Sequence, residues 1–121
     1  MSKKVSILGT EYSIETHKVS EDVYMRENRL AGYCSEDNKQ IIIADVSEEE
    51  FFVGMDEKAQ KIYYNKTLRH EIIHAFLNES GLSDCASVPV CAWSKHEEMV
   101  DWIAIQFPKI QKVYVELGCD T

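Results

Sequence analysis

The segment His70-Glu71-Ile72-Ile73-His74 places two imidazoles and a carboxylate within five residues. Residues four apart on a helix lie one turn apart on the same face, so His70 and His74 could bind one Zn²⁺ ion through bonds of about 2 Å. Glu71 is offset around the helix, where its carboxylate could face a metal-bound water and remove a proton from it. Because so short a pattern also occurs by chance, the rest of the sequence must supply a further ligand.

A third protein ligand is expected in residues 96–101 (HEEMVD), because a catalytic zinc ion has three protein ligands and an open position for water. Glu97 and Asp101 are four apart and share a helix face. Glu97 could therefore bind the metal while Asp101 accepts a hydrogen bond from the outward ring nitrogen of a ligand histidine. His96 and Glu98 are competing ligands, and His96 is also a candidate contact for the substrate or its oxyanion. The alternative is that these acids only stabilise the start of a helix through its dipole, which requires no metal.

The first of these motifs requires a long helix, and the sequence predicts one. Apolar residues recur at helical spacing over residues 56–80, where Asp56 is a suitable N-cap and Gly81 a suitable terminator. The connector that follows, residues 82–94, is long enough to reverse the direction of the chain.

The second motif opens another predicted helix, which begins near Ser94 or Lys95 and has a broad apolar face. Pro108 either kinks this helix or starts a further short helix that ends before Gly118. We expect the two motif-bearing helices to present the metal between them.

The N-terminal half of the chain predicts strands. Residues 4–19 contain two short β-compatible runs around a turn, and residues 30–34 and 40–44 form a second hairpin, in which the isoleucine run is the strongest strand. The polar residues 20–29 contain one helical turn at most. The expected fold is therefore α+β, a single domain with a small, mostly antiparallel sheet packed on two or three helices.

Composition excludes some partners. The formal net charge of −8, with 21 acidic against 13 basic residues and no basic stripe, argues against nucleic acid. The apolar run near the N-terminus is too short for a signal-peptide core or a membrane span, so we expect a soluble, cytoplasmic protein.

Four cysteines, Cys34, Cys85, Cys91 and Cys119, contain no CxxC pair. Without a secretory signal, free thiols are the expected state. Cys85 and Cys91 could still form a disulfide if the loop between them doubles back.

The two motifs together resemble those of a minimal zincin of the gluzincin type. In thermolysin-like enzymes the second motif is Asn-Glu-x-x-x-Asp, and the resemblance implies that Glu97 is the third zinc ligand and Asp101 the partner of a ligand histidine. His96 occupies the place of the asparagine. In size and layout the chain is also similar, over about residues 30–108, to the ImmA/IrrE-like metallopeptidases and related short proteins of bacteria and their phages, and residues 101–104 (DWIA) fit the end of their second helix.

The expected function is zinc-dependent hydrolysis of peptide bonds in a peptide or protein substrate, with Glu71 passing a proton from water to the leaving amine. His96, Tyr63 and Tyr64 are oxyanion candidates by residue type alone. The resemblance further implies that residues 40–44 form an edge strand that pairs with the substrate, although a plain core strand is an equal alternative. Two other functions stay open: a zinc-binding module without catalysis, and a metal-free interaction domain in which the motif is coincidental.

Overall fold

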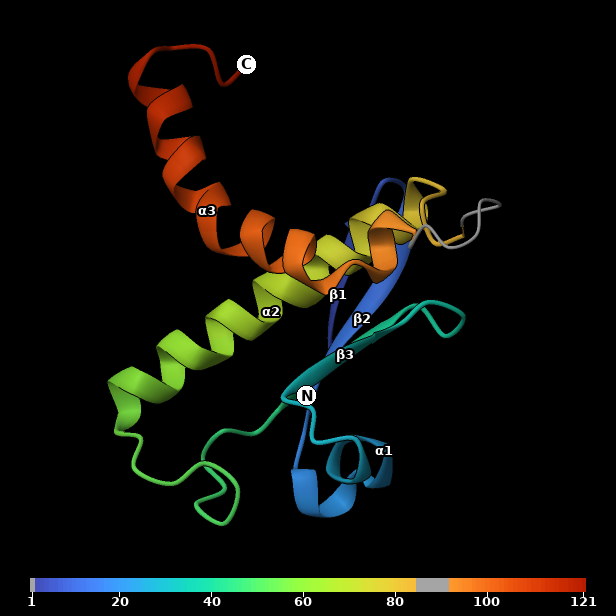
Figure 1. Cartoon of the computed structure of the whole chain (residues 1–121), viewed down its shortest axis with the longest axis vertical. Coiled ribbons are helices and arrows are strands. Elements are labelled where there is room, and N and C mark those ends of the chain that lie inside the picture. The colour runs from blue at the N-terminus through green and yellow to red at the C-terminus, as the bar shows by residue number, and fades with distance from the viewer. Residues whose placement is uncertain (1, 85–91) are drawn as a thin grey trace.

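The computed structural model describes residues 2–84 and 92–121, which form a four-stranded sheet with a long helix across one face and a second helix packed on the first (Figure 1). The expected α+β class is confirmed. In chain order the elements are β1 (Lys3–Ile7), β2 (Thr10–His17), the 3₁₀ turn η1 (Val19–Glu21), α1 (Val23–Glu27), β3 (Gly32–Ser35), β4 (Gln40–Ala44), α2 (Glu57–Glu79), the 3₁₀ turn η2 (Trp93–Lys95) and α3 (Glu97–Glu116).

The strand order across the sheet is β1-β2-β4-β3. Both predicted hairpins form, since β1 pairs with β2 and β3 with β4 in antiparallel fashion, while β2 and β4 join the hairpins by parallel pairing. The expectation that residues 40–44 form an edge strand is wrong, and the alternative of a core strand is confirmed. Among the described elements, β3 and β1 are the edges.

The isoleucine run explains why β4 is central. Ile41 and Ile43 are fully buried against α2 in one apolar cluster, whereas Ile42 and Ala44 are buried in a second cluster on the opposite face. Because successive side chains of a strand point to opposite faces, an uninterrupted apolar run is stable only where both faces are covered.

Each face of the sheet has its own cover. On one face, Ala75 of α2 completes the first cluster, and Leu68 and Ile72 pack against it. On the other, Met25 of α1 is buried, and Phe52 from the segment before α2 packs against the same cluster. The predicted single turn in residues 20–29 is in fact a 3₁₀ turn followed by the five-residue α1.

The long helix α2 agrees with its prediction at both ends. The Asp56 carboxylate accepts a hydrogen bond from the Ala59 N–H at 2.8 Å, which satisfies one of the unpaired amides of the first turn. Gly81 follows the helix with φ of 80°, the left-handed conformation that glycine adopts without steric cost.

The second helix begins at Glu97, two residues after η2, and runs through Pro108 to Glu116. Of the two alternatives for Pro108, the interior position is therefore confirmed and the separate short helix is wrong. Figure 1 shows that α3 changes direction along its length and that its last turns leave the body of the molecule. Proline inside a helix is a recognised cause of such a bend.

Cys34 and Cys119 have free thiols, as expected, whereas the Cys85–Cys91 alternative lies outside the described residues. Within residues 2–84 and 92–121, no helix combines the length with the apolar composition that crossing a membrane requires.

Gly32 sets the distance between the edge strand β3 and α2. A Cβ atom at this position would lie 2.9 Å from Cγ2 of Thr67 and 3.0 Å from the backbone oxygen of Ile42. We expect Gly32→Ala to lower the free energy of unfolding by about 1–3 kcal/mol, measured by urea denaturation, because the strand must shift away from the helix.

A second substitution tests that cause. Thr67→Ser removes the clashing methyl group but keeps the hydroxyl that donates to the Tyr63 carbonyl at 3.0 Å. It should recover part of the loss in the Gly32→Ala background. Equal stability of Gly32→Ala and the wild type would contradict the close packing.

Candidate metal centre

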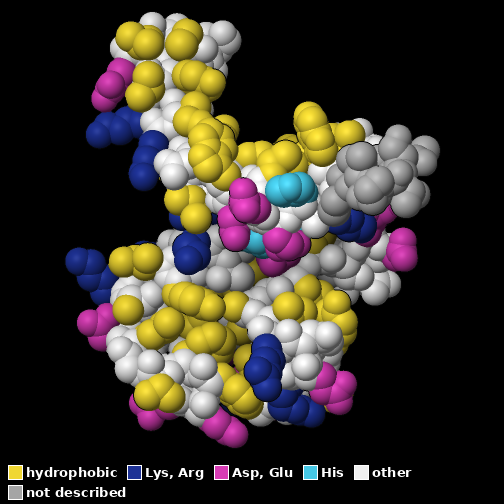
Figure 2. Space-filling view, in the orientation of Figure 1, with side chains coloured by type: hydrophobic (Ala, Val, Ile, Leu, Met, Phe, Trp, Pro, Cys, Tyr) yellow, Lys and Arg dark blue, Asp and Glu magenta, His cyan; other side chains and the backbone are white. Residues whose placement is uncertain are grey.

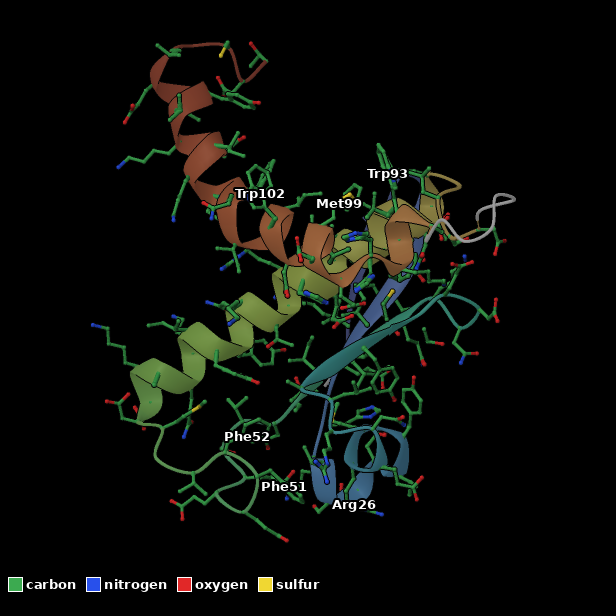
Figure 3. All side chains as sticks on the ribbon, in the orientation of Figure 1. Arg26, Phe51, Phe52, Trp93, Met99 and Trp102 are labelled. Carbon is green, nitrogen blue, oxygen red and sulfur yellow. The ribbon has the colours of Figure 1, made fainter. Side chains whose placement is uncertain are left out.

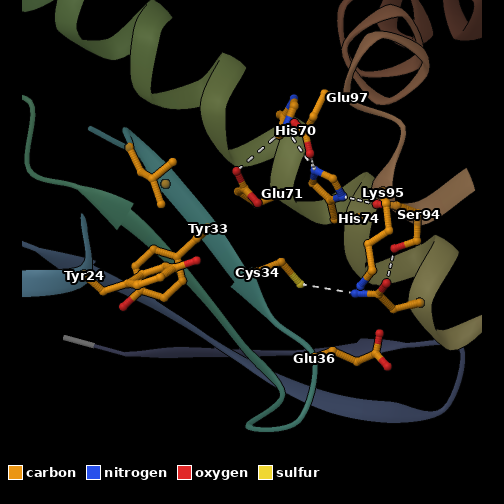
Figure 4. Close-up of a pocket in the computed structure, with 13 residues that line it drawn as sticks. Tyr24, Tyr33, Cys34, Glu36, His70, Glu71, His74, Ser94, Lys95 and Glu97 are labelled. Atoms are coloured by element: carbon orange, nitrogen blue, oxygen red, sulfur yellow. Dashed lines mark hydrogen bonds and ion pairs between the residues drawn. The ribbon is translucent and has the colours of Figure 1, made fainter. Parts of the chain in front are cut away.

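The two motifs meet where the start of α3 crosses the middle of α2. His70, Glu71 and His74 lie on α2, and their potential ligand atoms are within 4.8 Å of one another. Glu97 is the first residue of α3, and Asp101 lies one turn further along it. Helix packing thus brings these five sequence-predicted residues together, and Figure 4 shows His70, Glu71, His74 and Glu97 at the crossing.

Three side chains converge on one point. The Nε2 atoms of His70 and His74 are 3.0 Å apart. Oε2 of Glu97 lies 3.0 Å from Nε2 of His70, and Oε1 of the same carboxylate lies 3.1 Å from Nε2 of His74. Two imidazole nitrogens and a carboxylate therefore face each other at close range.

The other ring nitrogen of each histidine, Nδ1, points away from Glu97 and donates a hydrogen bond to an acceptor. Nδ1 of His70 donates to Oδ1 of Asp101 at 2.7 Å, and Nδ1 of His74 donates to the backbone oxygen of Ser94 at 2.7 Å. In a neutral imidazole whose Nδ1 carries the proton, Nε2 has a free lone pair. Both histidines are therefore oriented with a basic nitrogen toward Glu97.

This donor set fits a zinc ion. Zinc binds imidazole nitrogen and carboxylate oxygen at about 2.0–2.1 Å in tetrahedral geometry, which places neighbouring ligand atoms about 3.3 Å apart. The separations of 3.0, 3.0 and 3.1 Å among the three side chains are close to that value. Acceptors on the outward nitrogens are the usual support for histidine ligands. The Glu97 side chain is 67% exposed, so the centre is open to solvent.

Glu71 differs from Glu97 in place and environment. Its Oε1 lies 3.9 Å from Nε2 of His70, farther than the Glu97 carboxylate, and its side chain is buried. Burial raises the pKa of Glu71 to about 7; His70 opposes this shift, and the charges of Glu97 and Asp101 add to it. A carboxylate that titrates near neutral pH, beside the point of convergence, is suited to accept and return a proton.

His96 does not join the other motif residues. It is the N-cap of α3, and its Nδ1 accepts a hydrogen bond from the Met99 N–H at 3.1 Å. The two tyrosine candidates are also engaged elsewhere, because Tyr63 packs edge-on against Phe52 and the Tyr64 hydroxyl bonds Thr16.

Sequence reasoning missed the role of Ser94. Ser94 contributes its backbone carbonyl, which any residue type could supply, so the sequence gives no signal for this role. The carbonyl reaches His74 because η2 lies against α2. Ser94 is buried; its N–H donates to the Leu82 carbonyl at 3.0 Å and its hydroxyl donates to the Asn78 side chain. The residues that precede α3 are thereby tied to the end of α2.

Pro108 and Arg69 hold α3 on α2. Proline has no N–H, so the carbonyl four residues earlier, that of Ala104, loses its donor within the helix. Ala104 is buried, and its oxygen instead accepts a hydrogen bond from Nε of Arg69 at 3.1 Å. Arg69 directly precedes His70, so this bond fixes α3 beside the first histidine.

The centre opens into a cleft of about 420 Å³ between β3, α2 and the start of α3 (Figure 4). One wall consists of Gly32, Tyr33 and Cys34 of the edge strand, and Lys95 lies at the opposite side. Comparison of the chain with protein-family models, with curated proteins and with solved structures gives no match.

The Arg69–Ala104 bond predicts an energetic coupling between Arg69 and Pro108. Arg69→Met should lower the free energy of unfolding by about 1–3 kcal/mol, because it leaves a buried carbonyl without a donor. In the Pro108→Ala background the loss should be smaller by about 0.5 kcal/mol or more, since the new backbone N–H can donate to Ala104. Urea denaturation of the four proteins in this double-mutant cycle measures the coupling, and strictly additive losses would contradict it.

Proposed function

We propose that this protein is a zinc-dependent metallopeptidase of the gluzincin type that its two motifs resemble. The observation that carries the proposal is the convergence of Nε2 of His70, Nε2 of His74 and the Glu97 carboxylate within about 3 Å of one another. Because Nδ1 of each histidine donates a hydrogen bond, the Nε2 atoms keep the lone pairs that would bind the metal.

His70, His74 and Glu97 would hold the metal as three protein ligands, the number typical of a catalytic zinc site. Asp101 and the Ser94 carbonyl keep the imidazole rings in orientation through their Nδ1 atoms. A zinc ion bound there would polarise the scissile carbonyl and lower the pKa of a water molecule towards about 7.

Glu71 is the general base of the proposed reaction. Its buried carboxylate takes a proton from the attacking water and delivers it to the leaving amine, and a pKa of about 7 allows both transfers near neutral pH. Glu97 is less suited to this role because its carboxylate contacts both histidines and would be occupied in holding the metal.

The substrate is proposed to be an extended polypeptide that pairs with β3. In the part of the chain that the structure describes, β3 pairs only with β4, and its residues 32–34 line the cleft beside the histidines. Backbone pairing with such an edge positions a peptide bond without requiring a particular sequence. This role replaces the one expected for residues 40–44.

The zinc proposal is tested by elemental analysis of protein purified without a His tag. About one equivalent of zinc is expected, together with its loss in His70→Ala and its retention in His17→Ala, the control, because His17 bonds Glu15 and Asp22 instead. Asp101→Asn should weaken zinc affinity by about 10–100-fold, since the His70 ring loses its carboxylate partner. Less than about half an equivalent, unrecovered on adding zinc, would overturn the metal centre.

The catalytic proposal is tested with Glu71→Gln. This variant should retain zinc and lose about 10²–10⁴-fold in the rate of peptide cleavage, because only the proton acceptor is removed. Denatured protein and a random peptide library serve as substrates, and mass spectrometry identifies the cut bonds. If the zinc-loaded wild type cleaves nothing that Glu71→Gln spares, the protein is a zinc-binding module without peptidase activity.

A further inference from the structure

A second hollow lies on the same side of the molecule as the metal centre, in the view of Figure 2, and has a different chemistry. It is a groove of about 570 Å³ between the end of α1 and the segment that precedes α2. We call it the apolar groove; Phe51, Phe52 and Val53 form much of its wall, and Arg26 of α1 and Arg29, two residues beyond α1, also line it. Figure 3 labels Phe51, Phe52 and Arg26 in this region.

The wall of the apolar groove is apolar but accessible. Phe51 is 36% exposed and Val53 is 82% exposed, while Met25 at its base is fully buried. Figure 2 shows hydrophobic side chains gathered around a hollow on this face, below the histidines and acids of the metal centre. Contiguous exposed apolar side chains of this kind are typical of binding surfaces.

The charge at the apolar groove is opposite to that of the whole chain. Its only charged lining residues among those described are Arg26 and Arg29, although the chain carries a net charge of −8. Arg26 donates from Nη1 to the Ser20 carbonyl at 2.9 Å, and within the described residues neither arginine has a carboxylate within 4.0 Å. Both guanidinium groups are therefore available to an acidic ligand.

The apolar groove is continuous with the metal centre. A smaller cavity of about 230 Å³ lies between them. It shares Arg29 and Leu30 with the apolar groove, and His70, Glu71 and Glu97 with the cleft at the metal centre. A chain bound across the histidines can therefore extend into the apolar groove without leaving the surface.

We propose that the apolar groove binds the part of the polypeptide substrate flanking the cleaved bond, and that it selects a large apolar side chain next to an aspartate or glutamate. This inference rests on the proposed peptidase function and adds its substrate class. The apolar side chain packs on Phe51 and Val53, and the neighbouring carboxylate pairs with Arg29 and Arg26. Continuity with the cleft favours a polypeptide over a separate small ligand.

Binding is measured with zinc-loaded Glu71→Gln protein, so that no turnover interferes. The probes are fluorescent peptide mixtures with a fixed Leu-Asp, Leu-Asn or Leu-Lys pair in otherwise random sequence. The Leu-Asp mixture should bind about tenfold more tightly than the Leu-Lys mixture at low salt, and this preference should fall as salt rises. Arg29→Gln and Arg26→Gln should each reduce it, whereas Lys112→Gln on the exposed end of α3 is the matched control and should not.

Cleavage gives the second readout. In the wild type, kcat/KM for Leu-Asp peptides should exceed that for Leu-Lys peptides about tenfold. Arg29→Gln should reduce this ratio, whereas Lys112→Gln should leave it unchanged. Phe51→Ala, with its folding checked by thermal denaturation, should lower kcat/KM more for peptides with a large apolar residue than for Ala-Asp peptides.

The outcomes separate the two proposals. Cleavage without any Leu-Asp preference, or a preference unaffected by Arg29→Gln, overturns the groove and leaves the peptidase intact. Selective, Arg29-dependent peptide binding without cleavage supports the groove and overturns the peptidase. Arginine-dependent binding to phosphatidylglycerol vesicles, with equal affinity for all three peptide mixtures, overturns the groove as a peptide site.

Discussion

The candidate centre depends on the crossing of α3 over α2, and the hydrogen bond from Arg69 to the Ala104 carbonyl is one contact that fixes this crossing. Three of the five side chains of the centre, His70, Glu71 and His74, come from α2, and the helix itself spaces them. Glu97 and Asp101 lie on a different helix, α3. They reach the histidines only if α3 crosses α2 at the level of His70 and His74. Because Pro108 has no N–H, the Ala104 carbonyl is left to accept the hydrogen bond from Arg69. The proline thus removes one hydrogen bond within α3 and allows another that positions α3 on α2.

The centre gathers negative charge that would be costly without a cation. Glu71, Glu97 and Asp101 lie around two imidazoles, and the Glu71 carboxylate is buried. Burial and like charge both disfavour ionisation, and a divalent ion in their midst would reverse both effects. The same acids make the adjoining arginine-lined groove distinctive, because along one continuous surface the sign of the charge changes from negative at the cleft to positive beyond Leu30.

Local signals predicted most of the fold and much of the site. The caps of α2 at Asp56 and Gly81, both hairpins, and the alignment of Glu97 and Asp101 with the histidines all follow from spacing within one or two elements. The sequence did not predict features that depend on distant pairing. The position of β4 between two other strands depends on the pairing of separate hairpins, and the Ser94 carbonyl belongs to the backbone and carries no residue signature.

The parallel pairing of β2 with β4 also bears on how the molecule folds. Each hairpin closes a short loop, with Ile7 opposite Thr10 in one and Ser35 opposite Gln40 in the other. Joining them requires Ser13 to meet Gln40, across a much longer stretch of chain that contains α1. Loop-closure entropy makes this pairing costlier to form than either hairpin, because a longer stretch of chain must be ordered before apolar surface is buried. Strand β3 is joined to the first hairpin only through β4, so among the described elements the edge strand that lines the cleft depends on this long-range pairing for its place in the sheet.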